Sequence, residues 1–123
     1  MSDKRRGRAP ALFDDAAFAE DLRRASEAGA KVALAARREF EANGVPVPAL
    51  IPCEEEGPKG TALRHCMKLR LPSPQGKFGM VFRIELRQGK SILVFAAFGV
   101  RHHPGDSNAL SVYEIAHRRL HAS

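Results

Sequence analysis

The spacing of apolar residues changes once along this chain, near Leu63, and this change constrains the fold more than any other feature. Between residues 14 and 42, apolar residues recur at the three- and four-residue spacing of an amphipathic helix. In residues 67–71 and 80–87, apolar and polar residues alternate instead. A period of two is typical of strands with one buried face. The sequence therefore predicts helices in the first half and a sheet in the second.

Two helices are expected before the change. The first begins near Asp14 and Asp15, whose carboxylates suit a helix N-terminus, and stops at Gly29. The second runs from about residue 30 to residue 42 and ends at Asn43-Gly44. A connection this short favours an αα-hairpin.

Three antiparallel strands and a last helix are expected after the change. The strands cover residues 67–71, 80–87 and 92–98, with turns at 72–76 and 88–90. Residues 92–98 are wholly apolar, so they should form the central strand, buried on both faces. A helix begins near Asn108 or Ser111. The predicted class is α+β, with an N-terminal α-helical hairpin packed on a small antiparallel β-sheet and a C-terminal helix.

The length of 123 residues predicts one domain, spanning residues 11–123. Residues 1–10 are expected to be a flexible basic tail, and residues 44–62, rich in proline and glycine, an irregular connection. No apolar run is long enough to span a bilayer, and no apolar segment follows the basic N-terminus as in a secretory signal. Two cysteines without CxxC spacing are expected to be reduced. The predicted location is cytoplasmic, without a membrane partner.

Positive charge is concentrated in the predicted sheet half. Residues 64–123 carry ten Lys/Arg and three Asp/Glu, whereas residues 1–63 carry ten and eleven. All five histidines lie in the basic half. The sequence pI of about 9.9 favours an acidic partner, such as nucleic acid, an anionic membrane surface or an acidic protein. A basic sheet suggests a surface that holds a polyanion.

The strand alternation assigns the basic side chains to faces. If Leu69 and Leu71 turn to the core, then Lys68 and Arg70 must point to the other face. The same reasoning puts Arg83 and Arg87 on the outer face of the next strand, whereas Arg101 follows the apolar strand. On the last helix, Tyr113, His117 and His121 share a face at four-residue spacing.

Four stretches together resemble a known family. They are Cys66–Leu71, Gly79–Ile84, Ile92–Arg101 and Ser111–Leu120, in that order and spacing. The chain resembles the RelE/ParE superfamily of bacterial toxins, and within it the RelE-type mRNA interferases that act at the ribosome. The likeness covers roughly residues 63–121 and, more loosely, the preceding helices.

The resemblance implies a set of catalytic residues. Lys68 and Arg70 match two basic residues used in phosphate binding and general-base work, and Arg101 matches an arginine assigned to phosphate contact and general-acid work. Tyr113 matches a tyrosine that stacks on a nucleobase. The chain departs from the pattern at Gly79, where RelE-type proteins usually carry an arginine.

Further residues complete the predicted site. The pair His102-His103 is closer to the pattern of those superfamily members that use a histidine for proton transfer. Both histidines are therefore included in the predicted catalytic set. The predicted RNA-binding residues are Lys77, Arg83, Arg87, Arg118 and Arg119. The resemblance implies no metal and no organic cofactor. It implies two partners, namely mRNA on the ribosome and a cognate antitoxin whose acidic or amphipathic segment covers the basic face.

The predicted activity is endoribonuclease cleavage of mRNA by metal-free acid/base attack of the ribose 2′-hydroxyl. Two alternatives keep the fold: a ParE-like toxin that inhibits DNA gyrase, and a non-catalytic RNA- or protein-binding module. Ordinary structural roles also remain open. Lys68 and Arg70 could lie on a solvated strand face, Arg101 could cap a strand end, His102 and His103 could belong to an ordinary loop, and Tyr113 could be a partly buried core residue. His117 and His121 are expected to face solvent, and no metal site is predicted.

Overall fold

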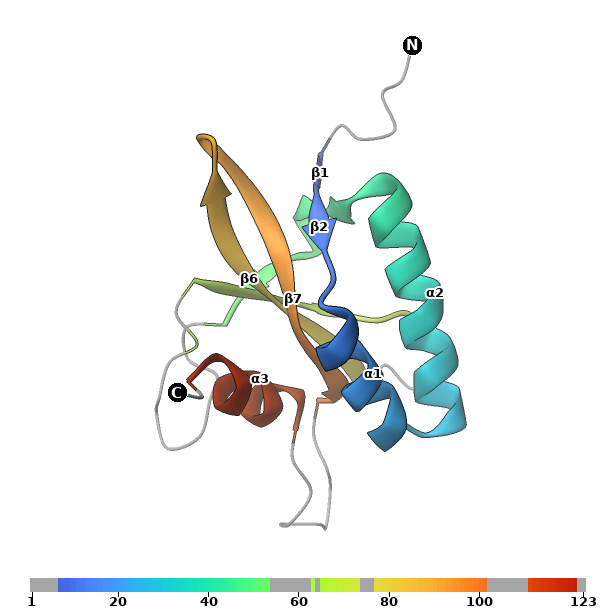
Figure 1. The fold of residues 1–123 in the computed structure, drawn as a ribbon. Helices are drawn as coiled ribbons and strands as arrows, with labels where there is room; N and C mark the ends of the chain where they lie inside the picture. The colour runs from blue at the N-terminus through green and yellow to red at the C-terminus, as the bar shows by residue number, and fades with distance from the viewer. Residues whose placement is uncertain (1–6, 54–62, 64, 74–76, 102–110, 122–123) are drawn as a thin grey trace.

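The computed structural model describes residues 7–53, 63, 65–73, 77–101 and 111–121, which form a mixed α+β fold with three α-helices and two sheets (Figure 1). The helices are α1 (Asp15–Arg24), α2 (Glu27–Asn43) and α3 (Val112–Leu120), with a 3-10 turn η1 (Val47–Ala49). The strands are β1 (Arg8–Ala9), β2 (Ala11–Leu12), β3 (Val45–Pro46), β4 (Ile51–Pro52), β5 (Cys66–Arg70), β6 (Phe78–Arg87) and β7 (Lys90–Val100). The predicted α+β class is confirmed.

The sheet is larger than predicted and is not purely antiparallel. Its strand order is β2-β7-β6-β5-β4, and β2 runs parallel to β7, pairing with Leu93 and Val94. The helices therefore follow two short strands, and the prediction of a hairpin on a small antiparallel sheet is wrong in these details. The folded part also extends into the predicted tail, because Arg8 and Ala9 of β1 pair with β3. Two-residue strands are too short to produce a detectable alternation of apolar residues.

The boundary between the two helices lies earlier than predicted. α1 is capped by Asp14, as expected, but α2 begins after Ser26, whose hydroxyl accepts a hydrogen bond from Gly29 N. Gly29 is thus inside α2 and is not a helix stop. A Cβ on Gly29 would lie 3.0 Å from the Phe78 ring, so the missing side chain allows close packing against β6. Within the described residues, no helix combines the length and apolar character needed to cross a membrane.

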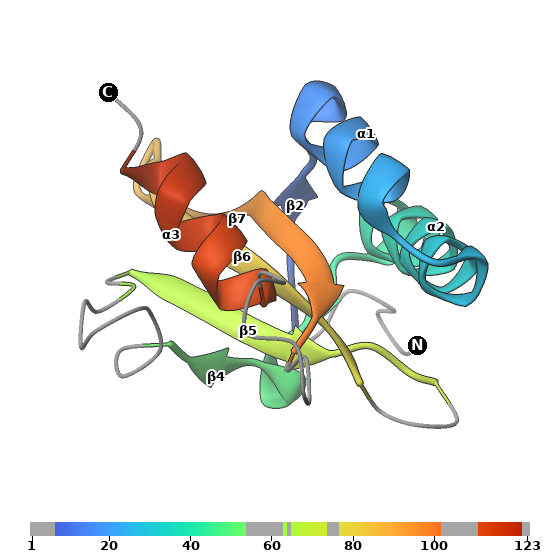
Figure 2. The same cartoon turned by 90° about the horizontal axis from the view of Figure 1, so that it is seen from below.

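Helices cover both faces of the five-stranded sheet. α1 and α2 lie against one face and α3 against the other, as Figure 2 shows from below. The first core joins Phe18 and Phe40 of the helices to sheet residues such as Met80 and Phe82. The second core joins Val112 and other α3 residues to the opposite face of β5–β7. The predicted burial of the apolar strand on both faces is confirmed for β7.

A β-bulge lets β7 serve both cores. Val81 pairs with Ala97 and Phe82 pairs with Phe95, so Ala96 is an extra residue on β7. A bulge of this kind shifts the in-and-out alternation of a strand by one residue. β7 can therefore place Phe95 in one core and both Ala96 and Ala97 in the other.

The turn between β6 and β7 and the start of α3 both lie where the sequence pattern predicts them. β6 and β7 are joined by Gln88 and Gly89, both with positive φ (52° and 77°), which is typical of a two-residue hairpin turn. The last helix is capped by Ser111, whose hydroxyl accepts a hydrogen bond from Glu114 N. The predicted hairpin turn and the start of the last helix near Ser111 are both confirmed.

The two cysteines face each other across β4 and β5 in the second core. Cys53 N donates a hydrogen bond to Cys66 O at 3.1 Å, and neither thiol forms a disulfide. Cys53 is fully buried and Cys66 is 2% exposed. Burial raises the pKa of the Cys66 thiol, with the positive charge of Arg83 opposing this effect. The reactive thiolate of Cys66 is therefore scarce in the folded protein at neutral pH.

We expect both thiols to resist iodoacetamide at pH 8 in the native protein and to react at once in concentrated guanidinium. Mass spectrometry after timed quenching measures the modified fraction at each cysteine. Because the pKa of Cys66 is raised on folding, its contribution to stability is present at neutral pH and is lost as the pH rises through the folded-state pKa. Rapid native modification of Cys66 would contradict the buried placement.

Candidate functional site

The predicted basic strand is β5, and its side chains lie on the expected faces. Leu69 and Leu71 are buried in the core beneath α1 and α2. Lys68 and Arg70 therefore point to the opposite face, which α3 covers in part. Lys68 is half-buried, whereas Arg70 is exposed.

The register of β6 and β7 gives this basic pair its surroundings. Lys68 is opposite Val81 of β6, and Arg70 is opposite Gly79. Gly79 is in turn opposite Gly99 of β7. Arg70 thus begins a row across three strands in which the next two residues have no side chain. The room that these glycines leave is taken by the Arg101 side chain over Gly79 and by Val112 and Ile115 of α3 over Gly99.

Tyr113 lies over the same face and contacts Lys68. It is the second residue of α3, and its position follows from the helix start at Ser111. The Nζ of Lys68 lies 5.1 Å from the centroid of the Tyr113 ring, within the range of a cation–π interaction. Only 6% of Tyr113 is exposed. A nucleobase could stack on this ring only if Lys68 moved away.

Arg101 reaches the same place from the end of β7. Its backbone N donates to Lys77 O at 2.8 Å, which fixes the start of its side chain beside the beginning of β6. Its Nε lies 3.5 Å from the Tyr113 hydroxyl, at the outer limit of a hydrogen bond. Its Cγ lies 2.9 Å from the position that a Cβ on Gly79 would occupy. The stem of Arg101 therefore crosses Gly79.

These placements bring four predicted residues together in what we call the basic cluster, defined as Lys68, Arg70, Arg101 and Tyr113. Three cations thus share one sheet face. Lys68 and Arg101 contact Tyr113 near the N-terminal end of α3, and Arg70 is opposite Gly79, over which the Arg101 stem passes. A convergence of positive charge on one face suits a phosphate group.

Arg83 and Arg87 share this face but bind to an acidic neighbour. Both form ion pairs with Glu85, which lies between them on β6. Hydrogen bonding to Arg87 holds the pKa of the Glu85 carboxyl below its usual range, and the positive charge of Arg83 adds to this effect. Their charge is therefore partly neutralised locally, nearer to the β6–β7 turn than the basic cluster is.

The other predicted residues lie around or outside this cluster. Lys77 is exposed and its Nζ lies 5.4 Å from the centroid of the Phe78 ring. Arg118 is exposed on α3, where it lines an open pocket between α1 and α3. His102 and His103 lie outside the described residues.

The two histidines of α3 differ in exposure. His121 is exposed, as predicted, but His117 is half-buried and its Nε2 is buried with no hydrogen-bond partner in the described structure. Their ring centroids are 4.4 Å apart. In the described part of the chain, no group of three or more His, Cys, Asp or Glu side chains could hold a metal ion.

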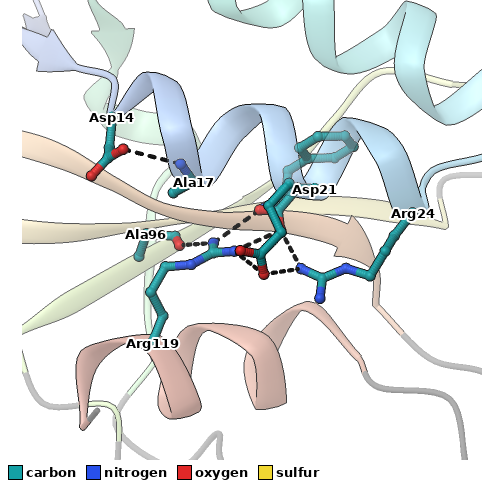
Figure 3. Close-up of polar contacts among 8 residues, drawn as sticks. Asp14, Ala17, Asp21, Arg24, Ala96 and Arg119 are labelled. Atoms are coloured by element: carbon teal, nitrogen blue, oxygen red, sulfur yellow. Dashed lines mark hydrogen bonds and ion pairs between the residues drawn. The ribbon is translucent and has the colours of Figure 1, made fainter. Parts of the chain in front are cut away.

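Arg119 belongs to a buried ion-pair network that fixes α3 to the sheet (Figure 3). Its guanidinium donates to both carboxylate oxygens of Asp21, at 2.9 and 3.0 Å, and to Ala96 O at 2.6 Å. Asp21 also accepts from Phe98 N at 3.0 Å and forms an ion pair with Arg24. Hydrogen bonding to Asp21 raises the pKa of Arg119. We therefore assign Arg119 a structural role.

This network completes the edge of β7. The β2 strand pairs with β7 only at Leu93 and Val94. The backbone N–H and C=O groups farther along the same edge of β7 therefore need other hydrogen-bond partners. Asp21 and Arg119 supply them, because one accepts from Phe98 N and the other donates to Ala96 O. The pair thereby connects α1, β7 and α3, and α3 carries Tyr113 into the basic cluster.

Sequence reasoning missed both Asp21 and the role of Gly79. One signal for Asp21 is present, because it lies three residues after Phe18 on the buried face of α1, where a carboxylate needs a partner. The room that Gly79 leaves for Arg101 depends on strand register and on the course of a side chain, which periodicity does not describe.

Comparison of this chain with known protein families, curated proteins and solved structures finds no relative from which a role could be transferred. The chain matches no family model, and no curated protein or solved structure is significantly similar to it. A function must therefore be inferred from the chemistry of the basic cluster itself.

Proposed function

We propose that this protein is an endoribonuclease of the RelE/ParE type that cleaves mRNA without a metal ion. The observation that carries the proposal is the convergence of Lys68 and Arg101 on Tyr113, with Arg70 on the same face of the sheet, opposite Gly79. These residues come from sequence segments up to 45 residues apart, and the chain fold gathers them. The positive charge that the reaction needs comes from side chains.

The proposed reaction transfers one phosphodiester within the RNA chain. A base removes the proton of the ribose 2′-hydroxyl, and the 2′-oxygen then attacks phosphorus. The bond from phosphorus to the 5′-oxygen breaks, and an acid protonates that oxygen. The products carry a 2′,3′-cyclic phosphate and a 5′-hydroxyl. Cations around the phosphate stabilise the charge that builds up in the transition state.

The basic cluster supplies candidates for the base and for phosphate binding. By the resemblance, Lys68 and Arg70 serve phosphate binding and general-base work, and Arg101 serves phosphate contact and general-acid work. We keep only the phosphate contact for Arg101, because a guanidinium does not release its proton in proteins. We assign the base to Lys68, because an amine can give up its proton whereas a guanidinium remains charged in proteins. His102 and His103 are further candidates for proton transfer.

Tyr113 takes a different role in this proposal from the one that the resemblance implies. Its ring lies under Lys68 and its hydroxyl lies next to Arg101. We assign it the orientation of these two cations rather than base stacking. Burial of 94% of its surface supports this assignment.

The proposal includes a setting and partners. The resemblance rests on an order of two helices, three antiparallel strands and a last helix, and the same order in the structure supports a RelE/ParE-like arrangement. The substrate would be mRNA on the ribosome, in the cytoplasm. A cognate antitoxin would place an acidic or amphipathic segment over the basic cluster.

A non-catalytic RNA-binding module is the second candidate, and the burial of Tyr113 favours it. A tyrosine that is only 6% exposed offers no free platform for a substrate base. In that case the cations would hold the RNA backbone without turnover. Salt dependence of binding is expected for both candidates and does not separate them.

Induced expression of the chain in a bacterial host tests the proposal directly. We expect growth arrest and new mRNA 5′ ends that carry a hydroxyl group, mapped by sequencing with and without prior kinase treatment. Plasmid supercoiling should stay unchanged, which separates this activity from gyrase inhibition. Unimpaired growth with intact transcripts, at verified levels of folded protein, would sink the proposal.

A further inference from the structure

Gly79 has a contact that requires the absence of a side chain. A Cβ at this position would lie 2.9 Å from Arg101 Cγ, 3.4 Å from Arg101 Cδ and 3.5 Å from Leu69 O. The first distance is shorter than real Cβ contacts allow. Gly79 lies within β6 and is not among the residues with positive φ. The glycine is thus needed here for space and not for backbone freedom.

Two contacts mark the course of Arg101 across this glycine. At one end, Arg101 N is bound to Lys77 O, so the side chain must leave the backbone beside the start of β6. At the other end, Arg101 Nε lies against the hydroxyl of Tyr113, which α3 holds in place. The aliphatic stem passes over Gly79 between these points. A methyl group at residue 79 would have to displace the middle of the stem, and with it the guanidinium.

We infer that Gly79 is a positioning residue that sets where the Arg101 guanidinium lies relative to Arg70. Arg70 is the residue opposite Gly79 on the neighbouring strand β5. For its role in catalysis, this inference rests on the proposed function. It also reinterprets the departure from the RelE pattern. An arginine at residue 79 and Arg101 in its present course exclude each other, so this chain has the arginine that follows β7 but lacks the one on β6.

A double-mutant cycle tests the inference. The four proteins are the wild type, Gly79→Ala, Arg101→Ala and the double variant. We expect Gly79→Ala to lower the rate of RNA cleavage by roughly 10- to 100-fold, because displacement of a positioned group by about 1 Å can have this effect. In the Arg101→Ala background, the same substitution should cause no further loss.

A second readout reports on geometry without any RNA. The chain has one tyrosine and no tryptophan, so its intrinsic fluorescence comes from Tyr113 alone. Arg101 lies against the Tyr113 hydroxyl, so moving it should increase quenching by acrylamide. We expect the same increase in Gly79→Ala, Arg101→Ala and the double variant. The matched control is Gly99→Ala on the neighbouring strand, where a Cβ would meet only ordinary contacts at 3.8–3.9 Å and quenching should stay at the wild-type level.

The outcomes separate this inference from the proposed function. Wild-type quenching in Gly79→Ala, or additive losses of cleavage rate in the cycle, would overturn the positioning role. If the wild type cleaves no RNA, the proposed function fails, while the fluorescence arm still decides the inference. If Gly79→Ala does not fold but Gly79→Ala with Arg101→Ala does, the clash with Arg101 is demonstrated and the inference is supported.

Discussion

Replacing Asp21 with asparagine is expected to lower the free energy of unfolding by about 3–5 kcal/mol, the usual result of removing one partner from a buried ion pair. The Asp21 side chain has no exposed surface, and its oxygens accept from Arg119 and from the backbone N of Phe98. An amide in its place leaves the half-buried Arg119 guanidinium with only the more exposed carboxylate of Glu20 as a charged partner. The amide N–H₂ of asparagine is itself a donor, and it would face the donors that bind Asp21, namely Arg119 and the backbone N of Phe98, with no acceptor to bind. Urea denaturation followed by circular dichroism measures the change.

Glu20→Gln is the matched control for this prediction. Glu20 contacts the same two arginines, Arg24 and Arg119, each at 3.3 Å, but its side chain is about half exposed. Exposed ion pairs contribute at most about 1 kcal/mol, so we expect a loss no larger than this. Equal effects of Asp21→Asn and Glu20→Gln would show that burial does not determine the strength of this network.

The loss of Asp21 should also reach the basic cluster. Arg119 attaches α3 to β7 and α1, and α3 carries Tyr113 next to Lys68. A loosened α3 would let Tyr113 move away from Lys68. Tyrosine fluorescence in Asp21→Asn, measured far below the unfolding transition, therefore reports whether the network positions the site as well as stabilising the fold.

Much of the fold could be predicted from apolar periodicity, because its long elements bury one face each. The alternation in residues 67–71 placed Leu69 in the core and Lys68 on the other face. The run at residues 92–98 indicated a strand buried on both sides, and Ser111 indicated the start of the last helix. These features depend on neighbours in sequence, which is what a periodic pattern describes.

The features that the sequence did not reveal depend on contacts between distant residues. β2 is a strand only because its two residues pair with Leu93 and Val94, about 80 residues away. Gly29 was predicted to end a helix, a common role of glycine, but here it makes room for Phe78. Local propensity is overridden in both cases by packing between elements.

The candidate site shows the same division. Alternation assigned Lys68 and Arg70 to the face opposite the core, and the resemblance then selected these two residues together with Arg101 and Tyr113. Arg119 was grouped with RNA-binding residues because sequence gives its charge but not its partner, Asp21. The side of a helix on which an arginine finds a buried carboxylate is a property of the assembled layers.

The second large effect concerns Lys68, where two substitutions separate charge from proton transfer. Lys68→Arg keeps a positive charge that can also lie over the Tyr113 ring, but a guanidinium does not act as a base at neutral pH. If Lys68 is the general base, Lys68→Arg should retain RNA binding and lower the cleavage rate by about 10²- to 10⁴-fold, the usual contribution of general acid–base catalysis. Lys68→Ala should weaken binding as well, because it also removes the charge.

Two measurements distinguish these effects: affinity for an RNA whose 2′-hydroxyls are methylated and cannot be cleaved, and single-turnover cleavage of the unmodified RNA. The control is Arg38→Ala, which removes one charge from an exposed position on α2, against the opposite face of the sheet from the basic cluster. It should leave both measurements near wild-type values. If Lys68→Arg cleaves RNA at the wild-type rate, Lys68 contributes charge alone and the base must be another residue. If neither the wild type nor any variant cleaves, while Lys68→Ala still weakens binding, then the basic cluster holds RNA without turnover, as a binding module would.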